Sequence, residues 1–187
     1  MEEKLELLKG RIEALKQVHH PLLVALDGGS AAGKSTLGAA LAQAVDATLI
    51  HMDDFFLPPE LRTKERFSQP GGNVHYERVK AEVLEPLAAG KPAEYGVFDC
   101  SKMAVGQTAR AEARDVIIVE GAYALHPELR EFFHLKVLVT VDPEVQKERI
   151  LRRNGAQMLR RFLEEWIPLE QTYFEACAVK DCCDLIL

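Results

Sequence analysis

The chain has 187 residues, of which 48% are hydrophobic and 28% charged, a composition that favours one compact domain over residues 1–187 rather than a disordered chain. Its net charge of -6 argues against general binding of nucleic acid, because phosphate backbones are held mainly by clustered Lys and Arg. The N-terminus has no signal-peptide pattern and no apolar run reaches the roughly 18 residues of a membrane helix, so we expect a cytoplasmic protein without a membrane partner.

The first predicted element is an amphipathic helix within residues 1–20. Its apolar stripe recurs at helical spacing at Leu5, Leu8, Ile12 and Leu15, until Pro21 breaks the pattern. This stripe packs either against the rest of the domain or against a second copy of the chain. The sequence leaves both alternatives open, and with them the existence of a homo-oligomer.

A buried strand and a glycine-rich turn follow this helix. Leu22–Leu26 is a short apolar run, which is typical of a parallel strand that is buried on both faces. It ends at Asp27-Gly28-Gly29, and residues 35–45 then have a helical pattern. Ala47–His51 is predicted as the second strand.

Beyond the second strand the chain leaves the alternating pattern. The consecutive prolines Pro58 and Pro59 end regular structure, and irregular chain is expected up to Asn73. A helix is predicted over Tyr76–Ala89. Because long loops in compact domains tend to carry function, we expect residues from about 57 to 105 to form a ligand-binding excursion.

The remaining elements complete an alternating series of strands and helices. They are strands at Val116–Val119 and Lys136–Val141, a helical stretch at Glu144–Ala178 that is interrupted near Gly155 and at Pro168, and a closing strand at Asp184–Leu187. This alternation predicts an α/β fold with a doubly wound parallel sheet. Ligands of such sheets bind at the carboxyl ends of the strands.

The segment between the first strand and the next helix has the spacing Gly-x-x-x-x-Gly-Lys-Ser, which predicts a phosphate-binding P-loop. Glycines let successive main-chain N–H groups turn toward phosphate oxygens beside the positive end of a helix. Lys34 can reach the β- and γ-phosphates, and Ser35 is placed to ligate Mg²⁺. The pattern therefore predicts ATP and Mg²⁺ as cofactors. The residues expected at the phosphates are Gly28, Gly29, Ser30, Ala31, Ala32, Gly33, Lys34, Ser35 and Thr36.

Acidic residues follow the predicted strands. Asp53 and Asp54 come after the second strand, and Glu120 directly follows Val116–Val119. A carboxylate at such a strand end can orient or deprotonate a hydroxyl; we expect Asp53 to do so, with Asp54 as the competing residue and helix capping as the alternative. Glu120 is expected to hold Mg²⁺ or its water, unless it forms an ion pair with a neighbouring Arg or Lys.

Arginines gather on the long C-terminal helical stretch. Guanidinium groups suit bidentate contacts with phosphate, and we predict a lid over about residues 149–165. The alternative is a solvated helix face whose arginines pair with acids such as Glu148 and Glu164. The arginines in question are Arg149, Arg152, Arg153, Arg160 and Arg161.

Together these motifs resemble those of the uridine kinase and phosphoribulokinase group of P-loop kinases. The resemblance rests on Gly28–Ser35, the Asp53-Asp54-Phe55-Phe56 run, Glu120-Gly121, and Arg149-Ile150-Leu151-Arg152. It implies a three-layer α/β/α sandwich with the P-loop nucleoside triphosphate hydrolase fold. It also implies transfer of the γ-phosphoryl group of ATP to a primary hydroxyl. The roles that it implies are Asp53 as catalytic base, Lys34 at the phosphates, Ser35 and Glu120 at Mg²⁺, and Arg149, Arg152 and Arg153 in a mobile lid.

The acceptor side departs from uridine kinases. His75 stands where uridine kinases typically carry an acid that grips the ribose hydroxyls, and Cys100 stands near the position of a uracil-reading histidine. The segment Tyr95–Cys100 resembles the base-binding hairpin. We expect the acceptor pocket to contain Asp53, His75, Tyr95, Phe98 and Asp99.

The leading hypothesis is an ATP-dependent kinase whose small-molecule acceptor is a nucleoside such as uridine or cytidine. A kinase of the same fold that acts on pantothenate, glycerate, a sugar or a sugar phosphate is the alternative. A regulatory ATPase that signals its nucleotide state to a partner protein is a third hypothesis. The cysteines lack paired Cys-x-x-Cys spacing and are expected to be reduced thiols.

Overall fold

Five parallel strands form the central sheet of the computed structural model, which describes residues 1–187. The strand order is β2-β5-β1-β6-β7, and every neighbouring pair is parallel. The strands are β1 (Leu22–Asp27), β2 (Thr48–His51), β5 (Val116–Glu120), β6 (Leu135–Leu138) and β7 (Leu185–Ile186). Because β1 lies between β5 and β6, the turn that follows β1 lies at the middle of the carboxyl edge of the sheet.

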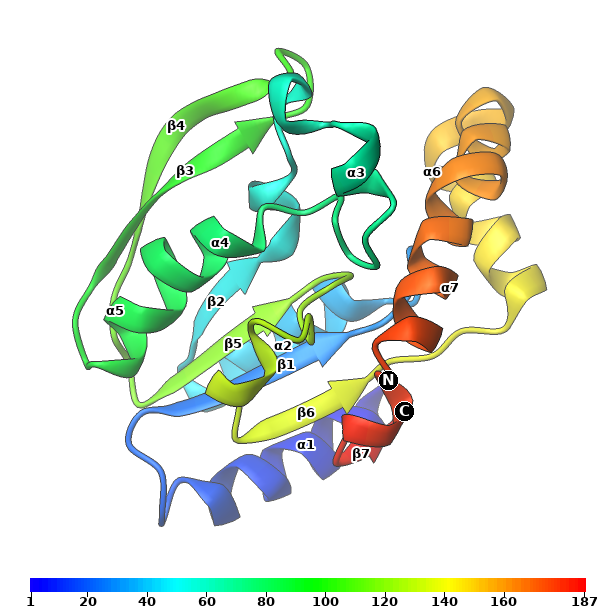
Figure 1. The fold of residues 1–187 in the computed structure, drawn as a ribbon. Helices are drawn as coiled ribbons and strands as arrows, with labels where there is room; N and C mark the ends of the chain where they lie inside the picture. The colour runs from blue at the N-terminus through cyan, green and yellow to red at the C-terminus, as the bar shows by residue number, and fades with distance from the viewer.

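Helices cover both faces of this sheet (Figure 1). Successive side chains of a strand point to opposite faces, so Val24 belongs to one hydrophobic cluster whereas Leu23 and Ala25 belong to another. Helices α1 (Glu2–Leu15) and α2 (Lys34–Val45) cover the face of Val24, and helical segments at residues 76–88 and 167–176 cover the other face. The predicted three-layer α/β/α fold is therefore confirmed.

The N-terminal helix packs onto its own domain. Leu8 and Ile12 of α1 are fully buried and share a hydrophobic cluster with Leu37 and Leu41 of α2. Of the two partners considered for the apolar stripe, the structure shows the intramolecular one.

Between β2 and β5 the chain forms the predicted excursion, which in Figure 1 stands across from the C-terminal helices α6 (Pro143–Arg161) and α7 (Ile167–Ala176). Residues 57–73 are mostly irregular, as expected, with only short helical turns. The elements are η1 (Met52–Phe55), η2 (Pro59–Leu61), α3 (Lys64–Phe67), a helix composed of α4 (Tyr76–Arg78), η3 (Val79–Leu84) and α5 (Glu85–Ala88), and a hairpin of β3 (Ala93–Asp99) and β4 (Ala104–Ala111).

Two prolines lie inside helical stretches without ending them. Pro86 follows the π-helical turn η3, and Pro168 follows a second π-helical turn, η5 (Phe162–Trp166). Proline lacks an N–H and collides with the carbonyl four residues earlier in a regular helix, and a π turn widens the helix at that place. The predicted interruption at Pro168 is therefore wrong. The interruption near Gly155 is confirmed, because this residue has φ 79 and ψ 171 within α6.

The end of β6 differs from the prediction. The strand ends at Leu138, before the predicted end at Val141, and the carbonyl oxygen of the next residue, Val139, lies against Gly28 in the turn after β1. Two 3-10 turns, η4 (Arg130–Phe132) and η6 (Lys180–Cys182), flank the last part of the sheet. A membrane span would need a longer and more apolar helix than any in this structure.

His126 is a buried histidine that the fold holds in its neutral form. Its ring stacks on Tyr76 with a centroid separation of 4.0 Å, and its Nδ1 accepts a hydrogen bond from the main-chain N–H of Glu128. Burial lowers the pKa of His126 to about 4; Arg66 and Arg130 also lower it, while Glu128 and Glu77 oppose the shift. The imidazole is therefore neutral in the folded protein at pH values where it is protonated in the unfolded chain.

We predict that His126 makes the protein less stable in weak acid. Between a pH of about 6.5 and about 4 the unfolded chain binds a proton that the folded protein does not, so the free energy of unfolding falls as the pH falls, by about 1–3 kcal/mol. Urea unfolding at pH 7 and pH 4.5 measures this loss, which should shrink in His126→Asn but persist in the exposed-site control His20→Asn. If the free energy of unfolding falls equally in wild type and in both variants, His126 is not the group responsible.

Candidate active site

The glycine-rich loop joins β1 to α2 at the carboxyl edge of the sheet. Helix α2 begins at Lys34, so its first main-chain N–H groups and its positive end face the loop. Gly28 has φ +148, and a Cβ atom there would lie 2.1 Å from the carbonyl oxygen of Val139. Only glycine permits this close approach. The Lys34 Nζ donates to the carbonyl oxygen of Gly29 at 2.8 Å, and this contact holds the side chain over the loop.

A fully buried carboxylate, Asp27, fixes the start of the loop. Its Oδ1 accepts from the N–H groups of Gly28 at 2.6 Å and Tyr123 at 3.1 Å, and its Oδ2 accepts from the N–H of Leu125 at 2.8 Å and the hydroxyl of Tyr173 at 2.7 Å. Burial raises the pKa of Asp27, and the hydrogen bonds from Tyr173, Leu125 and Gly28 oppose that rise. One side chain thus joins the loop, the segment after β5, and α7.

The C-terminal helices hold the loop from its other side. Gln146 Nε2 donates to the carbonyl oxygen of Ser30 at 2.8 Å, and Arg149 Nη1 donates to that of Ala31 at 3.0 Å. Glu170 of α7 accepts from the N–H of Ser30 at 3.0 Å and from its hydroxyl at 2.5 Å. Burial raises the pKa of Glu170, and the hydrogen bonds from Ser30 lower it.

One carboxylate oxygen of Glu120 is hydrogen-bonded to another side chain, and the other has no hydrogen-bond partner. Its Oε1 lies 2.6 Å from Nδ1 of His51, whereas its buried Oε2 has no hydrogen-bond partner. The hydrogen bond to Glu120 raises the pKa of His51. Gly38 makes room for this side chain, because a Cβ atom there would lie 3.3 Å from Glu120 Cγ. The ion pair considered from the sequence was with Arg or Lys, whereas the observed partner is histidine.

This acid fits a hard cation. Gly38 lies one helical turn after Ser35 on α2, so both lie on the same side of the helix. The Ser35 hydroxyl and an unpartnered buried carboxylate oxygen are the oxygen donors that Mg²⁺ prefers. The residues present therefore fit the magnesium ion that the sequence predicts.

Two cavities adjoin the loop and share Arg153 in their linings. The first, the P-loop cleft, has a volume of about 690 Å³ and contains Gly33, Lys34, Ser35 and Thr36 together with residues of α6. The second, the side cavity, has a volume of about 520 Å³ and lies between the excursion and the C-terminal helices. Its lining comprises Ser30, Asp53, Phe56, Arg62, Phe67, Asn73, Phe98, Cys100, Met103, Ala122, Tyr123, Arg153, Asn154, Met158, Arg161, Phe162, Glu165, Trp166, Leu169 and Glu170.

The structure separates the two aspartates that follow β2. Asp53 is accessible and lines the side cavity, whereas Asp54 does not line it and faces Tyr95. Partial burial raises the pKa of Asp53, and the nearby Glu120 raises it further, while Lys34, His51 and Arg153 lower it. Asp53 is therefore near the loop lysine and the candidate metal ligand at once.

The arginine cluster divides between the two cavities. Arg149 and Arg152 line the P-loop cleft, Arg161 lines the side cavity, and Arg153 lines both. Arg160 instead pairs with Glu164 at 2.8 Å on an exposed surface, as the solvated alternative expected. Arg153 is thus the guanidinium that both cavities share.

Of the residues expected at the acceptor, Asp53 and Phe98 line the side cavity and three others lie elsewhere. Tyr95 is buried against Phe55, at a ring separation of 5.2 Å. Asp99 accepts from the N–H and hydroxyl of Ser101 and so caps the hairpin turn. A bulge between Gly96 and Phe98 shifts the alternation of β3, so that Phe98 is the next buried side chain after Tyr95.

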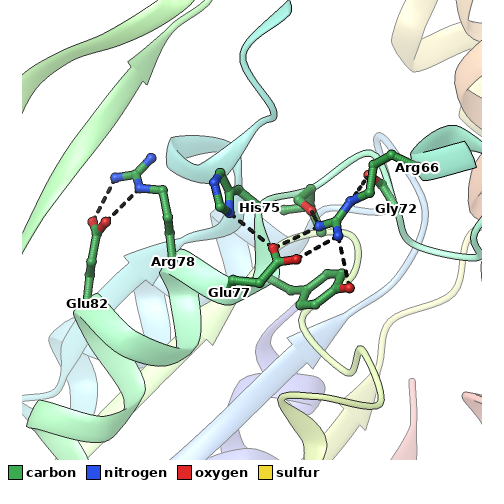
Figure 2. Close-up of polar contacts among 8 residues, drawn as sticks. Arg66, Gly72, His75, Glu77, Arg78 and Glu82 are labelled. Carbon is green, nitrogen blue, oxygen red and sulfur yellow. Dashed lines mark hydrogen bonds and ion pairs between the residues drawn. The ribbon is translucent and has the colours of Figure 1, made fainter. Parts of the chain in front are cut away.

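His75 belongs to an ion-pair network on the excursion (Figure 2). Its Nδ1 lies 3.1 Å from Glu77, whose carboxylate accepts from Arg66 at 2.6 and 2.8 Å. Arg66 also donates to the carbonyl oxygens of Gly72 and Val74 and to the hydroxyl of Tyr76. The network therefore holds the irregular segment in place and keeps His75 away from the side cavity.

The parallel sheet, the phosphate loop at its carboxyl edge and the adjoining cavity define a P-loop nucleotide-binding protein. No family model matches the chain. A uridine kinase from Chloroflexus aggregans is 32% identical over 148 residues, which are 74% of this chain and 70% of the relative. A uridine kinase from Streptococcus equi subsp. zooepidemicus is 29% identical over 152 residues, which are 75% of this chain and 70% of the relative.

The chain belongs to the uridine kinase-like family of P-loop kinases. Membership makes it a small-molecule phosphotransferase of a family that uses ATP. A solved structure described as a possible uridine kinase from Bacillus stearothermophilus covers 100% of both chains with a TM-score of 0.76 and 21% sequence identity. That likeness supports the fold alone.

Sequence reasoning missed Asp27, His51, Tyr123 and Glu170. Asp27 and His51 each precede a predicted site residue closely, yet nothing local shows that Asp27 binds α7 or that His51 binds Glu120. Tyr123 has φ +74, a conformation that is uncommon for a bulky residue and that no sequence pattern reveals. The partners of Glu170 lie far away in the sequence.

We predict that the Asp27 contacts stabilise the whole protein. Tyr173→Phe removes one donor to a buried carboxylate and should lower the free energy of unfolding by about 1–3 kcal/mol. Asp27→Asn places an NH₂ group opposite main-chain N–H donors and should cost more, about 2–4 kcal/mol. Denaturant unfolding checks both, with the exposed Thr172→Ala of the same helix expected to stay within about 0.5 kcal/mol. An Asp27→Asn protein as stable as wild type would overturn this prediction.

Proposed function

We propose that this chain transfers the γ-phosphoryl group of Mg-ATP to a hydroxyl of a nucleoside such as uridine or cytidine. The observation that carries the proposal is that both cavities adjoin the phosphate loop and share Arg153. Asp53 lines the side cavity, and Arg153 lines both that cavity and the P-loop cleft. A phosphate tail in the cleft and an alcohol in the side cavity would therefore meet next to a carboxylate, a guanidinium and Lys34.

In this proposal each residue has a positional or electrostatic task. Main-chain N–H groups of the loop and the positive end of α2 bind the phosphates, and Lys34 leaves Gly29 to contact the β- and γ-phosphates. Ser35 and Glu120 would hold Mg²⁺, and the bound ion would offset charge on the transferred group. Arg149, Arg152 and Arg153 contribute guanidinium groups from the predicted lid at about residues 149–165.

Asp53 is the proposed catalytic base. Its carboxylate accepts a hydrogen bond from the acceptor hydroxyl and takes the proton as the hydroxyl oxygen attacks the γ-phosphorus, while the bond from that phosphorus to the β,γ-bridging oxygen breaks and ADP leaves. The rise of its pKa through burial and Glu120 makes it a better proton acceptor than an ordinary surface aspartate. Lys34 and Arg153 limit that rise, because their positive charges favour the ionised carboxylate.

The lining of the side cavity supports a nucleoside-sized acceptor. A cavity of about 520 Å³ falls in the range of small-molecule sites. Phe56 and Phe98 contact each other edge-on at 6.3 Å on the excursion side, and Phe162 and Trp166 form a second aromatic pair on the helix side. Aromatic faces on both walls suit a planar base between them. The excursion at residues 57–105 would thus bind the acceptor.

A panel of acceptors tests the substrate. With ATP and Mg²⁺, uridine and cytidine should be phosphorylated, whereas pantothenate, glycerate, fructose and a sugar phosphate should not. Transfer to one of the latter alcohols with both nucleosides inert would reject the nucleoside assignment and retain the kinase.

We predict that Asp53→Asn abolishes acceptor phosphorylation, with kcat reduced about 100-fold or more, because the base is lost. Binding of Mg-ATP measured by calorimetry should stay within about threefold of wild type, whereas Lys34→Ala should weaken it. Asp54→Asn is the matched control and should keep most of the activity. Unchanged turnover in Asp53→Asn would remove this residue from the mechanism, and nucleotide hydrolysis without any acceptor transfer in the wild-type protein would favour the regulatory ATPase.

A further inference from the structure

Glu170 is a buried carboxylate of the side cavity that forms no ion pair, although the positive charge of Lys34 acts on it from nearby. It is 4% exposed, lies on α7, and takes part in none of the ion pairs of the structure. Its hydrogen-bond donors all belong to Ser30, the main-chain N–H at 3.0 and 3.1 Å and the hydroxyl at 2.5 Å. Burying a carboxylate without an ion pair costs free energy, and this cost points to a functional role for Glu170.

The carboxylate has capacity for further donors. Its two oxygens can accept about four hydrogen bonds, and Ser30 supplies one N–H and one O–H. The other lone pairs of the Glu170 carboxylate have no donor. Glu170 lines the side cavity, as do Tyr123 and Leu169. A molecule in this cavity that carries hydroxyl groups could therefore donate to Glu170.

The other acidic side chains that line the side cavity have a proposed role or an ion-pair partner. Asp53 is the proposed base, and Glu165 accepts from Arg161 at 3.0 Å. His75 stands where an acid was expected to grip hydroxyls, and it is held by Glu77 outside the cavity. Glu170 is thus the carboxylate of this cavity that is left for a second acceptor hydroxyl.

Building on the proposed function, we propose that Glu170 binds an acceptor hydroxyl other than the one that is phosphorylated, and so selects acceptors with several hydroxyl groups. In a nucleoside this hydroxyl would be the 2′- or 3′-OH of the ribose. The loop residue Ser30 holds the carboxylate in place, so the acceptor is anchored to the same loop that binds the phosphates. Selection arises because a deoxy acceptor leaves the buried carboxylate without its donor.

The test combines two changes in a double-mutant-type cycle: the variant Glu170→Gln on the enzyme, and the loss of one hydroxyl group on the substrate. Uridine, 2′-deoxyuridine and 3′-deoxyuridine are compared by kcat/KM in wild type and variant. In wild type, loss of the bound hydroxyl should lower kcat/KM about 10- to 100-fold, and in Glu170→Gln the same loss should matter less than about threefold. Equal penalties in both proteins would overturn the proposal.

Two further variants separate acceptor binding from support of the loop. Ser30→Ala removes a donor to Glu170 but leaves the carboxylate, so the penalty for deoxy acceptors should remain. Glu175→Gln, on the exposed side of the same helix, should behave as wild type. If Ser30→Ala and Glu170→Gln raise the KM for ATP alike and neither changes the penalty, Glu170 serves only the loop.

The substrate assignment and the role of Glu170 can fail separately. If another alcohol of the panel is the substrate, the cycle is run with that alcohol and its deoxy analogue. A wild-type protein that phosphorylates no alcohol rejects the proposed function. An active wild type without coupling between Glu170 and a hydroxyl rejects this inference alone.

Discussion

The buried carboxylate of Asp27 is the interaction on which the site depends. A buried charge is tolerated only when donors surround it, and here they come from the phosphate loop, the segment after β5 and α7. None of these segments can shift without leaving a buried donor or a buried charge unsatisfied. The relative positions of the loop, the side-cavity wall at Tyr123 and the helix that carries Glu170 are therefore set together.

The loop is also held by the helices that follow β6. Gln146 and Arg149 bind its carbonyl oxygens and Glu170 binds Ser30, so the loop contacts α6 on one side and α7 on the other. Gly155 interrupts α6 after Arg149, Arg152 and Arg153 and before Arg160 and Arg161. Its positive φ lets the chain change direction, and Arg153 lies next to this break and lines both cavities. The backbone break thus lies close to the guanidinium group that both cavities share.

Three acids of the site differ in what surrounds them. Asp53 is accessible, Glu120 is bound to His51 through one oxygen, and Glu170 is bound to Ser30. The environment, rather than the residue type, suits them to the different tasks proposed for them: a proton acceptor, a ligand with a free oxygen, and a hydrogen-bond acceptor for hydroxyls. One carboxylate chemistry can therefore serve three roles within a small site.

The sequence by itself determined the strands, most helices, the phosphate loop and its lysine, because these depend on apolar periodicity and on backbone requirements that are local. It also predicted that acids would follow the strands, which the parallel sheet brings to one edge. Only the tertiary structure decided that His75 and Asp99 bind their own neighbours, that Phe98 rather than Tyr95 lines the cavity, and that Glu170 meets Ser30. The strand bulge and the contact between Glu170 and Ser30, which lie far apart in the chain, leave no local pattern in the sequence. His75 and Asp99 contact residues only two positions away, and only the folded chain determines that they face these neighbours and not the cavity.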